Sequence, residues 1–387
     1  MSTRYTCDIF CTVVDNFGDI GVCWRLAQIL SGEHPVAVRL WVDDLQSFHR
    51  LAAEIDPALP QQHAGGVEIR FWNADFSTIH PAQLVIEAFA CALPEAYLAT
   101  MAAQPENPVW VALEHLSAED WVSGYHRLPS PHPVLPLTRY FFFPGFTKET
   151  GGLLLENGLL TRRDAFQHDP DAQLAFWNRL GVPAAHPEEL RVSLFCYENQ
   201  VVEELFSTWS HRKAPLCCLV PEGRILTQIA GYFGRKQLSA GDILQDGRLE
   251  VRVLPFMDQD DYDQLLWACD INFVRGEDSF VRAQWAGRPF IWHIYPQHDG
   301  VHQRKLQAFM ARYGEDLPAG VCSALHETWE IWNDKDSGDI AAAWQAFEAS
   351  RVMLRQHTLN WAGQLSTNNL ASNLLDFFRE IGKIRAS

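Results

Sequence analysis

Apolar segments of strand length alternate with amphipathic segments along the first third of the chain. Cys7–Val14 and Val36–Val42 are apolar, and Val22–Leu30 between them carries apolar residues at helical spacing. Two strands joined by a helix predict a βαβ unit, with a parallel sheet and a right-handed crossover. Three more strands are predicted at Val67–Trp72, Leu84–Ala88 and Val109–Leu113. We therefore expect a Rossmann-like N-terminal domain over residues 1–160.

A second series of the same kind follows the polar residues 161–190, which we interpret as the stretch between two domains. The predicted strands here are Arg191–Cys196, Leu216–Val220, Val251–Leu254, Ile271–Val274 and Arg288–His293, and the predicted helices are Val201–Trp209, Asp260–Trp267 and Phe280–Trp285. They predict a second Rossmann-like domain over residues 185–360. The last helix, about residues 361–387, is a candidate to pack back on the first domain.

Two Rossmann-like halves in one chain favour an α/β fold of the GT-B type, in which two such domains face a central cleft. Ligands of open α/β sheets bind outside the carboxyl ends of the strands, and in this architecture both sets of ends can face the cleft. The fold by itself leaves sugar-nucleotide transferases, oxidoreductases and binding proteins open.

Composition narrows the class of protein. The chain has 387 residues, 47% hydrophobic and 20% charged, which fits two globular domains and excludes a disordered or fibrous chain. Its 31 Lys and Arg against 48 Asp and Glu give a net charge of −17, so we expect no nucleic-acid partner. Without an apolar run of ~18 residues or a signal peptide, we expect no membrane contact. Nine cysteines without a CxxC pair are typical of reduced thiols in the cytoplasm.

The segment DNFGDIG, residues 15–21, joins the first predicted strand to its helix and carries two carboxylates, Asp15 and Asp19. It lacks the GxGxxG pattern, and its carboxylates would repel a pyrophosphate, so it is not a dinucleotide site. One interpretation is structural: Asp19 caps the helix and Asp15 forms an Asx turn. The other is chemical: the carboxylates bind a cationic acceptor or accept a proton. Spacing alone leaves both open.

The segment DINFVRGEDSF, residues 270–280, is again a strand, a loop and the start of a helix. Asp278 or Ser279 is a suitable N-cap, and Arg275 precedes a helix N-terminus whose N–H groups attract anions. This pattern fits the diphosphate of a nucleotide sugar, with Glu277 available for a ribose or sugar hydroxyl. Simple capping with an Arg–Glu surface pair is the alternative.

Aromatic residues follow two strands of the second domain. Phe195 and Tyr197 come just after its first strand, and Phe256 and Gln259 follow Val251–Leu254. Both pairs are placed where a nucleotide base could stack, and Gln259 could hydrogen-bond to the edge of that base. Core packing is the alternative for each aromatic residue.

A polar cluster follows the last predicted strand and consists of His293, Tyr295, Gln297, His298 and Asp299. Its spacing is wrong for a structural zinc site, and no cysteine joins it. We interpret the cluster as a polar rim of the cleft and predict no metal site.

Three segments of the chain, taken together, resemble the bacterial arginine rhamnosyltransferases that modify translation elongation factor P, the EarP family. The similar segments are DIFCTVVDNFGDIGVCWRLA (8–27), YFFFPGFT with TGGL (140–147 and 150–153), and FVRGEDS with Gln284-Trp285 and GRP (273–279 and 287–289). They extend from about residue 7 to about residue 306 and are unusual in composition.

The resemblance implies an inverting GT-B glycosyltransferase that moves L-rhamnose from dTDP-β-L-rhamnose to one arginine of elongation factor P. The product carries an α-rhamnosyl linkage, and the modified factor relieves polyproline stalling. The resemblance implies an acceptor-binding N-terminal domain, a donor-binding C-terminal domain, and elongation factor P and dTDP-rhamnose or dTDP as partners. It implies no cofactor and no metal ion.

The site residues that the resemblance implies fall into two groups. The catalytic residues are Asp15, Asp19 and Glu277, with either aspartate as the base. The donor contacts are Phe195, Tyr197, Phe256, Gln259, Arg275, Asp278, Ser279 and Tyr295.

Two other functions stay open at this point. A GT-B transferase with another acceptor, such as a lipopolysaccharide sugar, is disfavoured by the acidic charge, because membrane-facing enzymes carry basic or amphipathic surfaces. A non-catalytic nucleotide-sugar binding protein is disfavoured by the three candidate catalytic carboxylates. An NAD-dependent oxidoreductase is least favoured, since the glycine pattern is missing.

Overall fold

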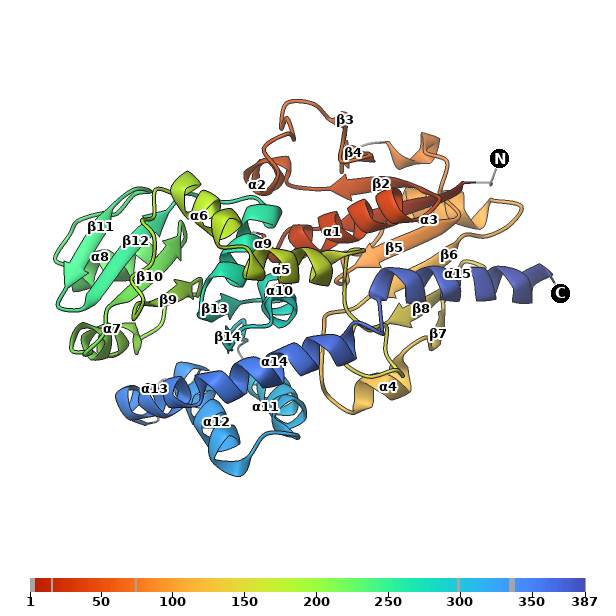
Figure 1. Ribbon diagram of the computed structural model, residues 1–387. Coiled ribbons are helices and arrows are strands. Elements are labelled where there is room, and N and C mark those ends of the chain that lie inside the picture. The colour runs from red at the N-terminus through yellow and green to blue at the C-terminus, as the bar shows by residue number, and fades with distance from the viewer. Residues whose placement is uncertain (1–3, 15–16, 74, 298–299, 334–337, 387) are drawn as a thin grey trace. The chain divides into compact units, whose positions relative to one another are not determined.

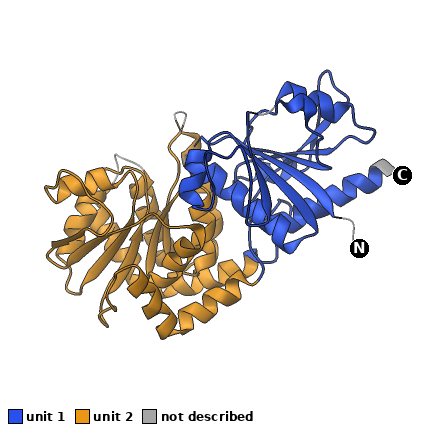
Figure 2. Cartoon of the chain, turned by 90° about the horizontal axis from the view of Figure 1, so that it is seen from above, with its two compact units in different colours: residues 1–157, 365–387 blue, residues 158–364 orange. Residues whose placement is uncertain are grey.

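The structure is a computed structural model that describes residues 4–14, 17–73, 75–297, 300–333 and 338–386 (Figure 1). The chain divides into two compact units (Figure 2). Unit 1 consists of residues 1–157 and 365–387, and unit 2 consists of residues 158–364. Each unit is built on one sheet of mostly parallel strands.

Unit 1 has an eight-stranded sheet in the order β3-β4-β2-β1-β5-β6-β8-β7. The six central strands run parallel, and β3 and β7 are antiparallel edge strands. The strands are β1 (Tyr5–Cys11), β2 (Val36–Val42), β3 (Gln61–Ala64), β4 (Val67–Phe71), β5 (Leu84–Ala88), β6 (Val109–Leu113), β7 (Pro129–Pro131) and β8 (Thr138–Phe142). The helices are α1 (Gly18–Glu33), α2 (Leu45–Leu51), η1 (Phe76–Thr78), α3 (Glu95–Ala102), α4 (Trp121–Tyr125) and α15 (Leu370–Ala386).

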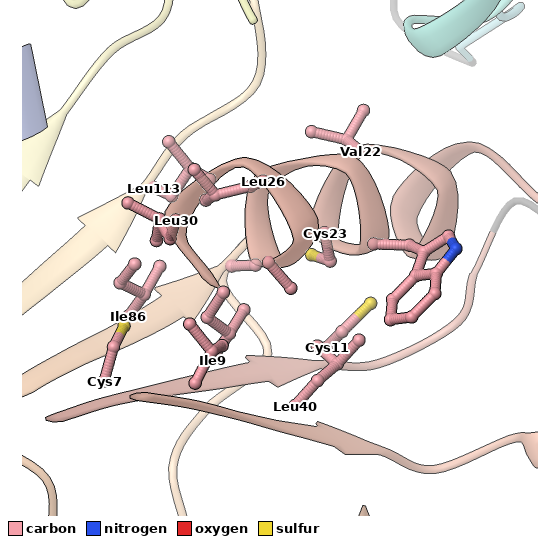
Figure 3. Packing of buried hydrophobic residues seen from close by; sticks show 14 of the residues in the cluster. Cys7, Ile9, Cys11, Val22, Cys23, Leu26, Leu30, Leu40, Ile86 and Leu113 are labelled. Carbon is pink, nitrogen blue, oxygen red and sulfur yellow. The ribbon is translucent and has the colours of Figure 1, made fainter. Parts of the chain in front are cut away.

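Alternation along β1 supplies apolar residues to both faces of this sheet. Ile9 and Cys11 lie under α1, and Figure 3 shows Cys23 of that helix packed over Cys11. Phe10 points to the opposite face, where its ring lies 4.8 Å from that of Tyr97 on α3. With both faces covered, as is typical of parallel sheets, the edge formed by the carboxyl ends of the strands is the place for polar chemistry.

The last helix, α15, belongs to unit 1. Leu374 and Phe378 are buried in the same core as Ile9. The chain just before α15 docks against Gly152, whose φ is 79°, and a Cβ added at Gly152 would lie 2.1 Å from the backbone oxygen of Asn368. Glycine is therefore required at this contact.

Unit 2 has a six-stranded sheet in the order β11-β12-β10-β9-β13-β14, parallel except for β11 at the edge. The strands are β9 (Leu190–Leu194), β10 (Leu216–Pro221), β11 (Ile243–Asp246), β12 (Leu249–Leu254), β13 (Ile271–Arg275) and β14 (Phe290–His293). The helices are α5 (Leu159–His168), α6 (Pro170–Arg179), α7 (Val202–Ser210), α8 (Leu226–Tyr232), α9 (Gln259–Ala268), α10 (Asp278–Ala286), α11 (Val301–Gly314), α12 (Ala319–Asn333), α13 (Ile340–Ala349) and α14 (Arg351–Leu365).

The polar residues expected between two domains instead begin unit 2 as the helices α5 and α6. Arg163 of α5 donates from Nη1 to the backbone oxygen of Trp285 at 2.8 Å. Gln167 donates from Nε2 to the backbone oxygens of Trp267 and Ala286 at 3.1 and 2.9 Å. The polar side chains thus satisfy carbonyl groups at the carboxyl ends of α9 and α10, which would otherwise lack partners.

Candidate active site

Asp19 lies in the first turn of α1, just after the carboxyl end of β1. Its side chain is 8% exposed, and its Oδ2 accepts the backbone N–H of Val14 at 3.0 Å. Asp43, which follows β2, accepts the N–H of Val13 at 2.8 Å. Two carboxylates, one on α1 and one after β2, therefore accept hydrogen bonds from the backbone just after β1.

Asp19 does not have the N-cap position that the structural interpretation gave it. The helix begins at Gly18, and Phe17 occupies the N-cap without a side-chain hydrogen bond. In the first turn, the partial positive charge of the helix N-terminus favours a carboxylate. Asp15, the other predicted carboxylate, lies outside the described residues.

The remaining predicted residues all follow the carboxyl ends of parallel strands in unit 2. Phe195 and Tyr197 follow β9, Phe256 and Gln259 follow β12, Arg275 ends β13 and is followed by Glu277, Asp278 and Ser279, and Tyr295 follows β14. Because these strands and β10 run in one direction, their carboxyl ends lie at the same edge of the sheet. This is the edge at which open α/β sheets bind ligands.

Arg275 lies against two of the predicted aromatic residues. Its Cζ is 4.4 Å from the ring centroid of Phe195 and 4.8 Å from that of Tyr197. The residue is only 9% exposed, and in the part of the chain that the structure describes no Asp or Glu forms an ion pair with it. A nearly buried guanidinium without a carboxylate partner is suited to bind an anionic ligand by charge-assisted hydrogen bonds.

The turn between β13 and α10 is fixed by Ser279. Its hydroxyl donates to the backbone oxygen of Arg275 and accepts the N–H of Arg275 at 3.0 Å, while Gly276 has a φ of 62°. Neither Asp278 nor Ser279 is the N-cap, so that prediction was wrong. Glu277 occupies the position, and its side chain makes no capping hydrogen bond. The reason is that the Ser279 hydroxyl is used by the preceding strand.

The aromatic and amide residues on the β9 and β12 side approach the same turn. Gln259, the first residue of α9, donates from Nε2 to Oδ2 of Asp278 at 3.4 Å. The ring of Phe195 packs edge-on against that of Tyr262 at 5.5 Å. Phe256 is half-buried two residues beyond β12. These contacts link Gln259 to the turn after Arg275 and link Tyr262 to Phe195, the ring on which Arg275 lies.

On the β14 side, Tyr197 connects Arg275 to two further rings. Its centroid lies 5.5 Å from that of Tyr295 and 5.2 Å from that of His293. Burial, together with the nearby Arg275 and His302, lowers the pKa of His293 to about 3. His298 and Asp299 of the predicted polar rim lie outside the described residues.

The structure thus brings Phe195, Tyr197, Arg275, Ser279 and Tyr295 into one connected set of contacts in unit 2, and a hydrogen bond joins Gln259 to Asp278, which precedes Ser279 in the chain. Asp19 belongs to unit 1 and Glu277 to unit 2. Among the described residues, no group of three or more His, Cys, Asp or Glu is arranged to hold a metal ion. Within the same residues, no helix has the length and apolar character needed to span a membrane.

Comparison with known proteins decides the family. The sequence pattern of the family described as "Elongation-Factor P (EF-P) rhamnosyltransferase EarP" matches residues 7–379. The chain belongs to this family. It is 49% identical over 378 residues to a protein-arginine rhamnosyltransferase of Pseudomonas putida, covering 97% of this chain and 99% of that protein. A protein-arginine rhamnosyltransferase of Neisseria meningitidis is 36% identical over 364 residues, 92% of this chain and 90% of that protein.

Solved structures agree with membership in the EarP family. A structure solved to explain EarP-mediated arginine glycosylation of translation elongation factor EF-P has a TM-score of 0.70 and 37% identity, over 97% of this chain and 99% of that one. A glycosyltransferase from Rickettsia africae has a TM-score of 0.53 at 10% identity, over 98% and 99% of the two chains, which shows the fold alone. The predicted family and the predicted GT-B fold are confirmed, and the chain is a glycosyltransferase.

Two residues that contact candidate site residues or the backbone beside them had no role in the sequence-based prediction for this EarP-family chain, one in each unit. Tyr262 lies on α9 and packs on Phe195, but a tyrosine inside a predicted helix gives no signal by itself. Asp43 holds the backbone next to Asp19, and only its place after the second strand could have indicated this.

Proposed function

We propose that this chain transfers L-rhamnose from dTDP-β-L-rhamnose to a single arginine of translation elongation factor P, with inversion at the anomeric carbon. The reaction takes place in the cytoplasm and uses no metal ion or other cofactor. One observation carries the donor half of the proposal: the guanidinium of Arg275 lies between Phe195 and Tyr197 without an ion pair to any described carboxylate. Membership in the EarP family supports the acceptor half.

The donor site is proposed to run across the edge of the unit 2 sheet. Phe195, Phe256 and Gln259 receive the thymine, by stacking and by an amide hydrogen bond. Arg275 and the N-terminus of α10 bind the diphosphate. The diphosphate supplies the negatively charged partner that the guanidinium lacks among the described carboxylates. Asp278 and Tyr295 complete the site on either side of Arg275.

The acceptor presents a difficult nucleophile. An arginine side chain has a pKa above ~12 and delocalised nitrogen lone pairs. A carboxylate with an ordinary pKa near ~3.9 does not deprotonate it in the ground state. Proton loss must therefore accompany bond formation: as the C–N bond forms, the attacking nitrogen loses conjugation and becomes acidic enough for a nearby carboxylate to take its proton.

Asp15 and Asp19 are proposed to bind the guanidinium by charge-assisted hydrogen bonds, and one of them takes the proton. Asp19 is suited to this because its carboxylate is nearly buried and already fixed by the N–H of Val14. A fixed carboxylate needs little reorganisation in the transition state. Glu277 is proposed to hydrogen-bond to a hydroxyl of the donor or to bind the acceptor guanidinium together with the two aspartates.

The leaving dTDP gains negative charge as the bond to rhamnose breaks. Arg275 and the N–H groups that open α10 are proposed to stabilise that charge, which is the role a metal ion has in other glycosyltransferases. The net charge of −17 favours a cationic side chain but not an acidic protein as a whole. Recognition of the elongation factor therefore depends on local complementarity around its arginine.

The stereochemical and donor parts of this proposal are tested together. Purified protein is incubated with elongation factor P and either dTDP-β-L-rhamnose or UDP-sugars, and the product of the productive donor is examined by NMR for its anomeric configuration. We expect product from dTDP-rhamnose alone, with an α linkage. A β linkage would contradict inversion, and equal use of UDP-sugars would contradict the donor assignment.

A further inference from the structure

His293 ends β14 directly beside the arginine of the donor site. Arg275 and His293 are register partners on the parallel strands β13 and β14. Register partners on adjacent strands lie about 4.8 Å apart and project their side chains from the same face of the sheet. The imidazole is therefore a neighbour of the guanidinium.

The surroundings of His293 leave one of its polar atoms without a partner. The residue is 6% exposed, with the rings of Tyr197 and Trp332 edge-on at 5.2 and 5.8 Å. Its Nδ1 is buried and has no hydrogen-bond partner among the described residues. An unpartnered buried polar atom costs about 1–3 kcal/mol, so its presence beside a ligand site needs an explanation.

The charge state of the imidazole follows from its neighbours. The basic groups that face it are Arg275 on β13 and His302 on α11, and the other titratable groups nearby are the phenols of Tyr197 and Tyr295. Burial, and to a smaller extent Arg275 and His302, lower its pKa to about 3. At neutral pH the ring is uncharged and carries one N–H, which makes it a hydrogen-bond donor whose charge does not change between pH 5 and pH 8.

The order of the strands indicates which part of the donor this N–H meets. The base-binding residues follow β9 and β12, Arg275 ends β13, and His293 ends β14 on the far side of Arg275 from the base. A nucleotide sugar laid across this edge places its distal, sugar-bearing phosphate next to β14.

We propose that His293 is a further donor-binding residue, and that its ring Nδ1–H hydrogen-bonds to the distal phosphate of the nucleotide sugar held by Arg275. The proposal rests on the proposed function, because it requires a nucleoside diphosphate at this edge. It gives the buried Nδ1 its missing partner when the donor is bound.

The test compares dTDP with dTMP, which lacks the distal phosphate, by titration calorimetry. His293→Phe keeps a ring and removes both nitrogens, and His293→Asn places an amide N–H near the position of Nδ1. A hydrogen bond to a charged group contributes about 1.5–3 kcal/mol. We therefore expect His293→Phe to weaken dTDP binding about ten- to a hundredfold, to leave dTMP binding unchanged, and His293→Asn to recover most of the loss.

A matched control is His357→Phe in the same unit. The Nε2 of His357 lies 2.7 Å from the backbone oxygen of Tyr313, so this variant loses a hydrogen bond within the protein. We expect it to lower the melting temperature and to leave dTDP affinity unchanged, whereas His293→Phe, which removes the unpartnered buried nitrogen, leaves the melting temperature of the ligand-free protein unchanged or raises it.

Three results would overturn the inference. Unchanged dTDP affinity in His293→Phe would show that the nitrogen meets no phosphate, and an equal loss for dTMP and dTDP would show that His293 only shapes the pocket. A variant-to-wild-type ratio of dTDP affinities that changes between pH 8 and pH 5 would show that the ring titrates. If the wild-type protein binds no dTDP, the proposed function itself fails, and this is seen before any substitution is made.

Discussion

Replacing Arg275 with methionine separates its role in binding from its role in stability. Methionine keeps an unbranched apolar stem of similar reach but removes the guanidinium. The Cζ atom of that group lies 4.4 Å from the ring centroid of Phe195 and 4.8 Å from that of Tyr197. We expect dTDP affinity to fall while the ligand-free protein keeps its stability.

The magnitudes follow from the contacts. Two cation–π contacts stabilise the folded state by about 1 kcal/mol each, and Arg275→Met loses them. Burying a charge that has no paired anion destabilises the folded state by several kcal/mol, and the substitution removes that cost. The free energy of unfolding should therefore stay the same or rise by about 1–2 kcal/mol. Losing a bidentate contact to the diphosphate costs about 3 kcal/mol, which is about a hundredfold in dissociation constant.

The assay is titration calorimetry with dTDP and with thymidine, together with thermal unfolding of the ligand-free protein. Arg275→Met should lose dTDP affinity and keep thymidine affinity. Arg275→Lys, which retains charge without the planar fork, should fall between the two. Unaltered dTDP affinity in Arg275→Met would place the diphosphate elsewhere, and a large loss of stability would refute the argument that the guanidinium is kept for a ligand.

Three further predictions concern other parts of the molecule. Asp19→Asn should keep dTDP binding and lower the rate of rhamnose transfer at least a hundredfold. Asp43→Asn, at the neighbouring carboxylate, should keep most of the activity. Equal turnover in wild type and Asp19→Asn would contradict the proposed binding of the acceptor guanidinium by Asp19. The folded-state pKa of His293 is about 3 against an ordinary value of 6.5, so the unfolded chain binds the proton more tightly and stability is lost as pH falls below 6.5. Relative to His293→Phe, the wild type should lose about 2 kcal/mol between pH 7 and pH 5 in denaturant titrations, and parallel curves would contradict this. Gly152→Ala puts a Cβ 2.1 Å from a backbone oxygen and should destabilise the protein by several kcal/mol, while Gly181→Ala, at a φ of 68° with nothing within 4 Å, should cost about 1 kcal/mol; similar melting temperatures would refute the close contact.

Several elements could be predicted from the sequence because burial alone determines them. β6 has the predicted bounds, since a strand buried on both faces is a continuous apolar run, which Pro108 and Glu114 end here. β5 also has the predicted bounds, although it contains the buried Glu87. α5 was missed for the opposite reason. Its polar residues Arg163 and Gln167 hydrogen-bond to carbonyl groups of neighbouring helices, and a pattern of polar residues does not show that their partners are buried. The edge strand β3, Gln61–Ala64, is too polar to be recognised.

The candidate site was predictable as a set of positions but not as a set of contacts. Residues that follow parallel strands must gather at one edge, so Phe195, Arg275 and Tyr295 could be assigned to it in advance. That Arg275 lies between two rings depends on the register of β9 against β13. That Ser279 bonds to the strand instead of capping the helix depends on the left-handed turn at Gly276. Neither fact is encoded in local spacing.

The central claim is that this chain places a rhamnose on one arginine of elongation factor P. Its most direct test is the intact mass of purified elongation factor P after incubation with this protein and dTDP-β-L-rhamnose. We predict a gain of one deoxyhexose, which disappears when the acceptor arginine is replaced by lysine. If the mass does not change although the enzyme still binds dTDP-rhamnose, the proposed acceptor is contradicted. That result would favour another acceptor, such as a lipopolysaccharide sugar.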